Sequence, residues 1–277
     1  MITTAAILAR GLGTRMRRAD SATQLDESQT TAADSGVKGM IPIAGVAATA
    51  TPRPFLDYVL SDLADVGITH AVLVVGPEHG AVREYFARDN SLRRVQVTYA
   101  IQEQPLGTAN AVVAAADVVG DDAFLVLNAD NVYPREALRQ LVASAKAATI
   151  AFDRETLVRE GNIDRQRVGA FAVLELSSDG RLLGIIEKPG ASLDLKSSAA
   201  RWVGMNCWTI TPDVVDACRR VPLSSRGEYE LPEAVALAIR GGVEVRAICV
   251  ALPVLDLSQR ADIPAVVAHL AAIEPRP

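Results

Sequence analysis

The chain has 277 residues, of which 49% are hydrophobic and 22% charged, enough to bury a large core as one α/β unit or two small domains. This composition excludes a disordered, collagen-like or coiled-coil protein. Its 28 Lys and Arg residues against 33 Asp and Glu give a formal net charge of −5, and no basic run exceeds the length of Arg17-Arg18. We therefore expect no nucleic-acid partner and no membrane partner.

The first residues show no secretion signal, because residues 1–10 lack a basic start and their short apolar run passes directly into glycines. No apolar run approaches the roughly 20 residues that are needed to cross a bilayer. Cys207, Cys218 and Cys249 are odd in number, at spacings that fit neither a zinc site nor a disulfide framework. We expect a soluble cytoplasmic protein, and the sequence leaves open whether it forms a homo-oligomer.

Short apolar runs alternate with amphipathic stretches through the first half, which is the pattern of parallel strands with crossover helices. Residues 2–9 predict a strand, and residues 54–66 predict a helix because apolar side chains recur at helical spacing before Gly67. Thr108 is in a position to cap a helix. The other elements predicted in this half are strands at 71–75, 95–101 and 123–127 and helices at 78–87 and 108–118.

This order of elements predicts a doubly wound α/β sheet, whose ligands bind beyond the carboxyl ends of the strands. In the second half, residues 170–176 and 181–187 flank a Ser-Ser-Asp-Gly turn, so antiparallel strands are expected to join a mostly parallel mixed sheet. Trp202 and Trp208 are an even number of residues apart, which predicts one face of a single strand, packed in the core. Helices are predicted at 212–219, 230–239 and 262–273.

One segment departs in composition from the rest. Residues 17–36 are polar and rich in Ala, Ser, Thr and Asp, which predicts a long loop or a loop with one short helix. The sequence shows no repeat of fixed period and no hexapeptide array after the last predicted helix, so we expect no β-helical domain at the carboxyl end of this chain. A single domain over residues 1–277 is the expected organisation.

The first predicted strand leads into Gly11-Leu12-Gly13-Thr14-Arg15. Glycine amides at such a turn form a nest for phosphate, the threonine hydroxyl adds a donor, and the arginine can pair with phosphate through two hydrogen bonds. The dinucleotide fingerprint is disfavoured because its third glycine would fall at Met16, and a P-loop is excluded because no Gly-Lys-Ser/Thr follows. Alone, the pattern fits equally well a glycine turn with a surface arginine.

Six further motifs accompany this loop in a fixed order. They are Lys38-Gly39-Met40-Ile41-Pro42-Ile43, Gln102-Glu103-Gln104-Pro105-Leu106-Gly107-Thr108-Ala109, Asn128-Ala129-Asp130-Asn131, Glu187-Lys188-Pro189, Arg226-Gly227-Glu228-Tyr229-Glu230-Leu231 and Leu255-Asp256-Leu257. Together the motifs resemble the sugar-1-phosphate nucleotidyltransferase family over nearly the whole chain.

The resemblance implies a Rossmann-like fold with a nucleotide-binding half at 1–132 and a sugar-phosphate half at 133–277. It also implies a reaction in which a sugar 1-phosphate attacks the α-phosphorus of a nucleoside triphosphate, giving an NDP-sugar and pyrophosphate. Magnesium is the implied cofactor. Because two polyanions must meet in line, such a reaction depends mainly on positioning and charge neutralisation.

The resemblance also implies a role for individual residues. Arg15, Lys38 and Lys188 would be catalytic, the first two by holding the triphosphate and stabilising the leaving pyrophosphate. The metal would be held by Asp130 and Asp256, whose hard oxygens suit Mg²⁺. The nucleotide-binding residues implied are Leu8, Ala9, Gly11, Gly13, Thr14, Arg15, Gln102, Gly107, Thr108 and Asp130, and the sugar-side residues are Asn131, Gly169, Glu187, Lys188 and Asn206.

Within the nucleotide set, Gln102 would read the base edge through its amide and Gly107 would leave room for the ring. Several of these residues also have simpler interpretations: Lys38 as a solvated loop lysine, Asp256 as a turn residue before a helix, and the Glu187-Lys188 pair as a surface ion pair. The sequence also departs from the family pattern. Arg10 stands where another glycine is common, and Lys38 lies 23 positions after Arg15.

Two other functions remain open at this point. One is a glycosyltransferase that uses an NDP-sugar, with Asn128-Ala129-Asp130 as a degenerate metal motif, although a diphosphate donor needs no triphosphate cradle. The other is a non-catalytic sensing protein that kept this fold. For the favoured transferase, the sequence favours uridylyl or thymidylyl transfer to glucose 1-phosphate, with guanylyl transfer to mannose 1-phosphate next.

Overall fold

The computed structural model describes residues 1–45, 51–88, 92–144, 146–187 and 200–277. Its strands are β1 (Thr4–Leu8), β2 (Pro42–Ile43), β3 (Arg53–Pro54), β4 (His70–Val75), β5 (Gln96–Ile101), β6 (Phe124–Asn128), β7 (Asn131–Val132), β8 (Ala148–Asp153), β9 (Ala172–Leu176), β10 (Leu182–Ile186), β11 (Trp202–Gly204), β12 (Trp208–Ile210), β13 (Arg246–Val250) and β14 (Leu255–Asp256).

Its α-helices are α1 (Thr14–Arg17), α2 (Glu27–Ser35), α3 (Phe55–Asp65), α4 (Gly80–Arg88), α5 (Thr108–Val119), α6 (Arg135–Ala143), α7 (Arg154–Glu160), α8 (Arg165–Val168), α9 (Pro212–Arg220), α10 (Leu231–Arg240) and α11 (Ile263–Leu270), with short 3₁₀ turns η1 (Lys38–Met40) and η4 (Arg260–Asp262). The strands and helices predicted in the first half are all present, with bounds that differ by a few residues. None of the described helices has the length and apolar character to cross a membrane.

The main sheet follows the order β10-β9-β11-β8-β12-β6-β1-β4-β5, and β13 pairs in parallel with β8. Its first half is parallel: β1 lies between β4 and β6, and Leu8 pairs with both Val74 and Asn128. The chain builds outward from β1 through β4 to β5 and then returns to place β6 on the other side of β1. This reversal is a topological switch point, which opens a crevice beyond the carboxyl ends of the flanking strands.

The second half adds antiparallel strands, as predicted. β9 and β10 form the expected hairpin, and β12 runs antiparallel to both β6 and β8. The prediction that Trp202 and Trp208 share one strand is wrong, because Asn206 adopts a left-handed φ of 52° and separates β11 from β12. Trp208 is buried in the core as predicted, whereas Trp202 is half-buried under the guanidinium of Arg201.

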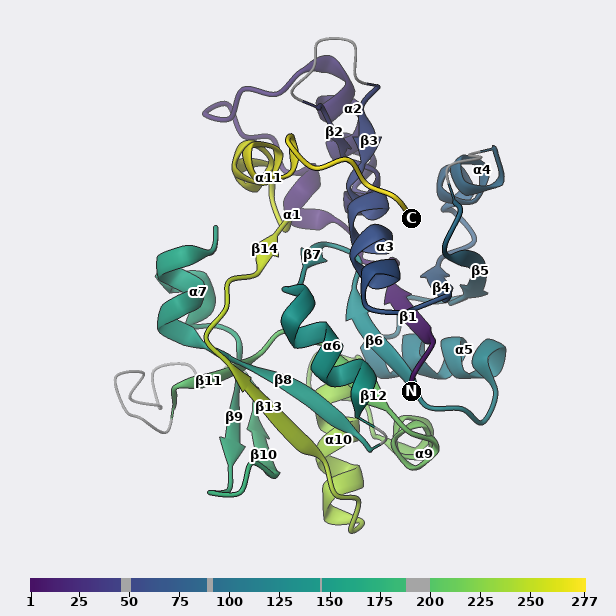
Figure 1. Cartoon of the computed structure of the whole chain (residues 1–277), viewed down its shortest axis with the longest axis vertical. Coiled ribbons are helices and arrows are strands. Elements are labelled where there is room, and N and C mark those ends of the chain that lie inside the picture. The colour runs from purple at the N-terminus through teal and green to yellow at the C-terminus, as the bar shows by residue number, and fades with distance from the viewer. Residues whose placement is uncertain (46–50, 89–91, 145, 188–199) are drawn as a thin grey trace.

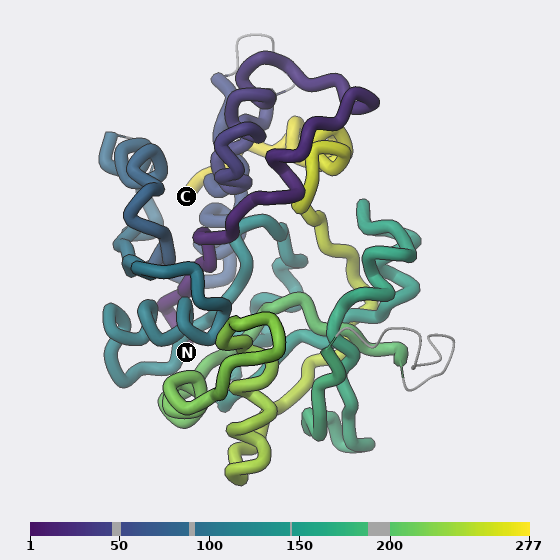
Figure 2. Tube along the Cα trace, turned by 180° about the vertical axis from the view of Figure 1, so that it is seen from behind, coloured from purple at the N-terminus to yellow at the C-terminus, as the bar shows by residue number. Residues whose placement is uncertain are grey.

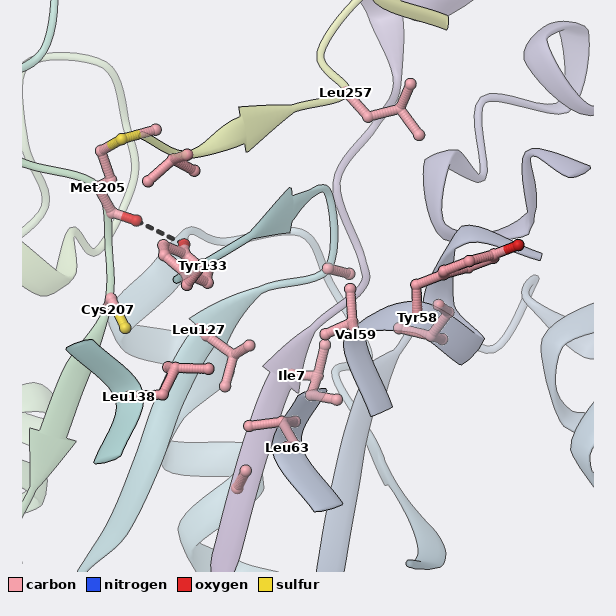
Figure 3. Close-up of a cluster of buried hydrophobic side chains, with 14 of the residues drawn as sticks. Ile7, Tyr58, Val59, Leu63, Leu127, Tyr133, Leu138, Met205, Cys207 and Leu257 are labelled. Carbon is pink, nitrogen blue, oxygen red and sulfur yellow. Dashed lines mark hydrogen bonds between the residues drawn. The ribbon is translucent and has the colours of Figure 1, made fainter. Parts of the chain in front are cut away.

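Helices cover both faces of the sheet (Figures 1 and 2). Buried side chains of α3, α6 and α11 form one core with the sheet, and those of α5, α9 and α10 form a second core on the opposite face. Figure 3 shows part of the first core, where Ile7 and Leu127 of adjacent strands meet Leu63 of α3 and Leu138 of α6. The parallel strand ends are thus anchored from both sides, which gives the crevice a rigid floor.

The polar segment 17–36 contains one short helix, as predicted. Asp26 caps α2 by accepting from the backbone N–H of Gln29, and the helix ends at Gly36 with a left-handed φ of 76°. Gly36 packs against Gly13, where any Cβ would collide with the Gly36 backbone. The segment is therefore held against the glycine-rich loop, and the glycine at 13 permits this close approach.

Candidate active site

A first cavity of about 270 Å³ lies at the switch point, beyond the carboxyl ends of β1, β5 and β6. Backbone and small side chains make much of its wall, which leaves room for a flat or extended ligand. The structure brings together here most of the nucleotide-binding residues predicted from the sequence, namely Leu8, Ala9, Gly11, Gln102, Gly107, Thr108 and Asp130, together with Lys38, which was predicted to be catalytic.

The predicted base-reading segment closes one end of this cavity. The Gln102 side chain is almost fully buried, and its Nε2 donates to the Gly107 carbonyl at 3.0 Å and to Asn110 Oδ1 at 2.8 Å. The amide nitrogen thus holds the loop in shape. Its Oε1 atom, which accepts no hydrogen bond within the described residues, is the part of the side chain left for a ligand.

In the structure, Gly107 and Thr108 make contacts with the backbone before α10 that the sequence did not predict. Gly107 has a φ of 106°, and a Cβ there would lie 2.5 Å from the Tyr229 carbonyl oxygen, so the glycine admits the Tyr229 backbone. The prediction that Thr108 caps α5 is wrong: Gly107 is the N-cap, and the Thr108 hydroxyl accepts from the Leu231 N–H at 2.9 Å. These contacts join the base-reading segment to the start of α10.

Lys38 and Asp130 form an ion pair in the wall of the first cavity. Lys38 Nζ donates to Asp130 Oδ2 at 2.6 Å, and both side chains are mostly buried. Lys38 is therefore not a solvated loop lysine. Asp130 follows β6, as the sequence predicted, and its Oδ1 atom has no hydrogen-bond partner among the described residues.

A second cavity of about 640 Å³ adjoins the first, and Asn128 and Asp130 line both. Its walls come from β7, β9, β11, β12 and β14 and from the segment before α10. Predicted residues that line it are Arg15, Asn131, Glu187, Asn206 and Asp256, and Gly169 directly precedes the lining residue Ala170. Asp130 is thus placed where the two cavities meet.

Arg15 is exposed at α1 and lines the second cavity, whereas Lys38 lines the first. Its guanidinium makes no hydrogen bond or ion pair with the described residues. Gly13 and Thr14, which were predicted to bind the nucleotide, do not line either cavity; Gly13 contacts Gly36 instead. Lys188 lies outside the described residues.

Asp256 is buried in the second cavity on β14, directly beside Asn131 of β7. Its Oδ1 accepts from Asn131 Nδ2 at 2.9 Å and from the Ser258 hydroxyl at 3.1 Å, and its Oδ2 pairs with Arg167. Burial, followed by the charge of Asp130, raises the pKa of the Asp256 carboxyl to about 6, and Arg167 opposes this shift. The carboxylates of Asp130 and Asp256 line the same cavity.

The sequence analysis missed the role of Arg167. This arginine, in α8, binds Asp256 and also donates to Asp262 Oδ1 at 2.6 Å. Asp262 in turn accepts from the backbone N–H groups of Ser258 and Gln259 at 2.9 Å each. No local sequence signal links these residues, because Arg167 lies 89 positions from Asp256.

Arg226 was part of a motif in the sequence but received no role. In the structure it lines the second cavity and pairs with Glu230, the N-cap residue of α10. Arg15, Arg167 and Arg226 therefore place three guanidinium groups in the wall of the second cavity, beside the carboxylates of Asp130, Glu187 and Asp256. Such a set of guanidinium groups is suited to a phosphorylated ligand.

Comparison with known proteins agrees with this arrangement. The nucleotidyl transferase family model matches residues 46–249. The chain belongs to this family. The resemblance found in the sequence is thereby confirmed, and the predicted mixed α/β fold with mostly parallel central strands is also that of the solved structures described below.

Two curated relatives illustrate the similarity. A UTP–glucose-1-phosphate uridylyltransferase of Haloferax volcanii, AglF, is 30% identical over 244 residues, which are 88% of this chain and 86% of the relative. A glucose-1-phosphate thymidylyltransferase of Streptomyces antibioticus is 29% identical over 246 residues, 89% of this chain but 60% of that protein. The chain thus spans most of the first relative and a little over half of the second.

Solved structures show the same fold. A UDP-glucose pyrophosphorylase in complex with UDP-glucose superimposes with a TM-score of 0.73 at 16% identity, covering 97% of this chain and 98% of that one. The UTP-bound enzyme from Acinetobacter baumannii gives a TM-score of 0.72 at 20% identity, covering 100% of this chain and 95% of that one. At this level of identity the likeness establishes the architecture.

Proposed function

We propose that this protein transfers a nucleotidyl group from a nucleoside triphosphate to a sugar 1-phosphate, giving an NDP-sugar and pyrophosphate. The observation that carries the proposal is the junction of the two cavities at Asp130, with Lys38 on one side and Arg15 on the other. A nucleotide in the first cavity and a sugar phosphate in the second would bring their phosphates together at this junction.

The first cavity suits the nucleotide. Gln102 presents an amide oxygen at its wall, and Lys38 contributes a cation. A base beside Gln102 and a triphosphate beside Lys38 would place each part of the nucleotide against complementary chemistry. Lys38 would then exchange Asp130 for phosphate oxygens and stabilise the charge that develops on the leaving pyrophosphate.

The second cavity suits a phosphorylated sugar. Amide and carboxylate side chains of Asn131, Glu187 and Asn206 line it and match the donors and acceptors of hydroxyl groups. The guanidinium groups of Arg15 and Arg226 would hold the phosphate. By this division the nucleotide side is built mainly by residues 1–132 and the sugar side mainly by residues 133–277.

The residues at the junction fit Mg²⁺ as a cofactor. Mg²⁺ binds through one or two carboxylates together with phosphate oxygens and water, and Asp130 offers an oxygen without a partner among the described residues. Asp256 would be the second ligand, and a divalent cation would offset both the burial and the repulsion from Asp130 that raise its pKa. When bound, the ion would neutralise phosphate charge and orient the two substrates.

The transfer itself requires no covalent intermediate on the protein. An oxygen of the sugar phosphate forms a bond to the α-phosphorus while the bond from that phosphorus to the β-phosphate oxygen breaks, and pyrophosphate leaves with the bonding electrons. The tasks left to the protein are alignment and charge neutralisation. Side chains that converge on Asp130 from both cavities can perform both tasks.

We favour uridylyl or thymidylyl transfer to glucose 1-phosphate, in accord with the names of the relatives from Haloferax volcanii and Streptomyces antibioticus. Guanylyl transfer to mannose 1-phosphate is the next choice. The test is a grid of the common nucleoside triphosphates against a panel of sugar 1-phosphates, with pyrophosphate release as the readout, in Mg²⁺ and again in EDTA. We expect metal-dependent release in one or a few combinations, whereas silence throughout with folded protein would refute the proposal.

A further inference from the structure

Arg10 is a departure from the family pattern that the proposed function does not use. It follows Ala9 at the end of β1, where the resembling family commonly has a glycine, and its side chain is only 8% exposed. It lines the first cavity together with Gln102. A long cationic side chain is therefore added to the wall of a nucleotide site at a position that the family usually leaves empty.

The Arg10 side chain crosses the carboxyl ends of β4 and β5. Its Nη1 donates to the backbone carbonyl of Gln102, and its Nε and Nη2 each lie 3.4 Å from a carboxylate oxygen of Glu78. Gln102 is itself fixed to β4 by its N–H, which donates to the Val75 carbonyl at 2.9 Å. Arg10 is thus held beside the segment that was predicted to read the base.

These contacts leave part of the guanidinium available. A guanidinium has five N–H donors, and the contacts with Gln102 and Glu78 engage three of them. The Glu78 side chain is 55% exposed and both of its contacts with Arg10 are long, so water screens this pair and the positive charge is only partly balanced. The base end of the cavity therefore offers hydrogen-bond donors and a positive charge.

Gln102 supplies the opposite polarity next to Arg10. Its Nε2 is occupied by Gly107 and Asn110, so its side chain can offer a ligand only the acceptor Oε1. A base that fits this end must place a carbonyl oxygen toward Arg10 and a ring N–H toward Gln102. Uracil, thymine and guanine have this pair on adjacent atoms, whereas cytosine and adenine have an amino group beside an unprotonated ring nitrogen.

We propose that Arg10 is a specificity-determining residue that selects nucleotides with a keto base over those with an amino base. The inference rests on the proposed function, because it assumes that the first cavity holds the nucleotide. It adds the physical basis of base choice: cytosine and adenine would direct an amino donor at the guanidinium and an acceptor at Oε1, which is repulsive at both points.

The test is a calorimetric titration of UTP, GTP, CTP and ATP into the protein in the presence of Mg²⁺ and without a sugar phosphate. CTP and ATP carry amino bases, and UTP and GTP carry keto bases. We compare the Kd of whichever of CTP and ATP binds more tightly with the Kd of whichever of UTP and GTP binds more tightly, as the ratio of the first to the second. We expect a ratio of about ten or more for the wild type, since a hydrogen bond to a charged group is typically worth at least one order of magnitude.

Arg10→Ala removes the guanidinium and should reduce this ratio to within about threefold, while Arg10→Gln, which keeps a neutral donor, should give an intermediate ratio. Arg88→Ala is the matched control: Arg88 also pairs with a glutamate but lies on an exposed helix surface, and its ratio should equal the wild-type value. The Tm of each variant reports folding, and Arg10→Gln carries the test should Arg10→Ala not fold.

Three results would overturn the inference: a wild type that prefers CTP or ATP, a wild type that binds no nucleotide, or substitution of Arg10 that weakens all four nucleotides equally. The last would show that Arg10 binds phosphate. Pyrophosphate release measured on the same samples separates this inference from the proposed function. Turnover with an unchanged base ratio contradicts only the role of Arg10, whereas selective binding without turnover contradicts only the transfer reaction.

Discussion

The two cavities that meet at Asp130 are constructed by different means. The first lies at the ends of parallel strands and uses backbone, glycines and a lysine that is already paired with an aspartate. The second is enclosed by antiparallel strands and α8, and it gathers arginines from three distant parts of the chain. The first cavity is thus shaped by local chain geometry, and the second by charge pairing between residues far apart in the sequence.

In both cavities the buried carboxylates form ion pairs with cations of the protein. Lys38 rests on Asp130 and Arg167 rests on Asp256, so the carboxylates expected to hold a metal are each neutralised by a cation from the same cavity. Arg15 alone among these cations makes no such pair within the described residues. A buried carboxylate left without a partner would be costly, and these ion pairs avoid that cost.

The largest expected effect comes from the residue that both cavities share. Asp130→Asn removes the charge while keeping the shape, and we expect turnover to fall by at least about 1,000-fold, as for the loss of a charged group at a reacting centre. The Tm should fall only modestly, because the amide oxygen of the substituted side chain can still accept from Lys38 Nζ. Asp121→Asn, at an exposed position, is the control, and turnover of Asp130→Asn within threefold of wild type would contradict the shared role of Asp130.

The next two substitutions distinguish the substrate bound in the first cavity from the substrate bound in the second. Lys38→Met should raise the KM for the nucleoside triphosphate and lower kcat, whereas Arg226→Met should raise mainly the KM for the sugar 1-phosphate, each by about 10- to 100-fold. Steady-state kinetics with each substrate varied in turn measures the two KM values. If both variants changed the same KM, the assignment of one substrate to each cavity would be wrong.

A third substitution acts on the contact that joins the base-reading segment to the residues before α10. Gly107→Ala must tolerate a φ of 106° and a clash with the Tyr229 backbone, so we expect it to lower the free energy of unfolding by about 3 kcal/mol. Gly67→Ala, with a φ of 94° and open space around the Cβ, should cost only about 1 to 2 kcal/mol. Urea denaturation compares the two, and equal losses would show that the Tyr229 contact is not tight.

The smallest expected effect lies at the edge of the site. Arg260 is buried, donates to the Met16 carbonyl at 2.9 Å and pairs with Asp34 of α2. Since the Asp34 side chain is 63% exposed, Asp34→Asn should lower stability by roughly 0.5 kcal/mol and leave turnover unchanged. A loss of turnover greater than threefold would instead reveal that segment 17–36 contributes to catalysis.

The first cavity could largely be predicted from the sequence. Its residues follow parallel strands, and the local alternation of strand and helix patterns in the sequence predicts those strands. Leu8 and Asn128 are neighbours for this reason, and Asp130 follows directly. Gly107 lies at the first cavity, where it was predicted. A positive φ can be suspected from a glycine, but its contact with Tyr229 is a tertiary event.

The second cavity was only partly predictable. Glu187 was predicted from a motif and Asn206 from a single position of the family resemblance. The pairing of Arg167 with Asp256, by contrast, depends on how α8 docks against β14. The division of residues 202–210 into two strands also escaped prediction, since a left-handed Asn206 leaves no periodic signal. Charge networks and strand breaks are decided by three-dimensional packing rather than by spacing along the chain.

The most direct test of nucleotidyl transfer across this junction follows a radioactive label on the α- or the γ-phosphate into the products. The best nucleoside triphosphate from the substrate grid is supplied with ³²P at the α position or at the γ position, together with its sugar 1-phosphate and Mg²⁺. The account predicts that the α label appears in the NDP-sugar and the γ label in pyrophosphate. Recovery of the γ label in the sugar product or in inorganic phosphate alone would contradict it.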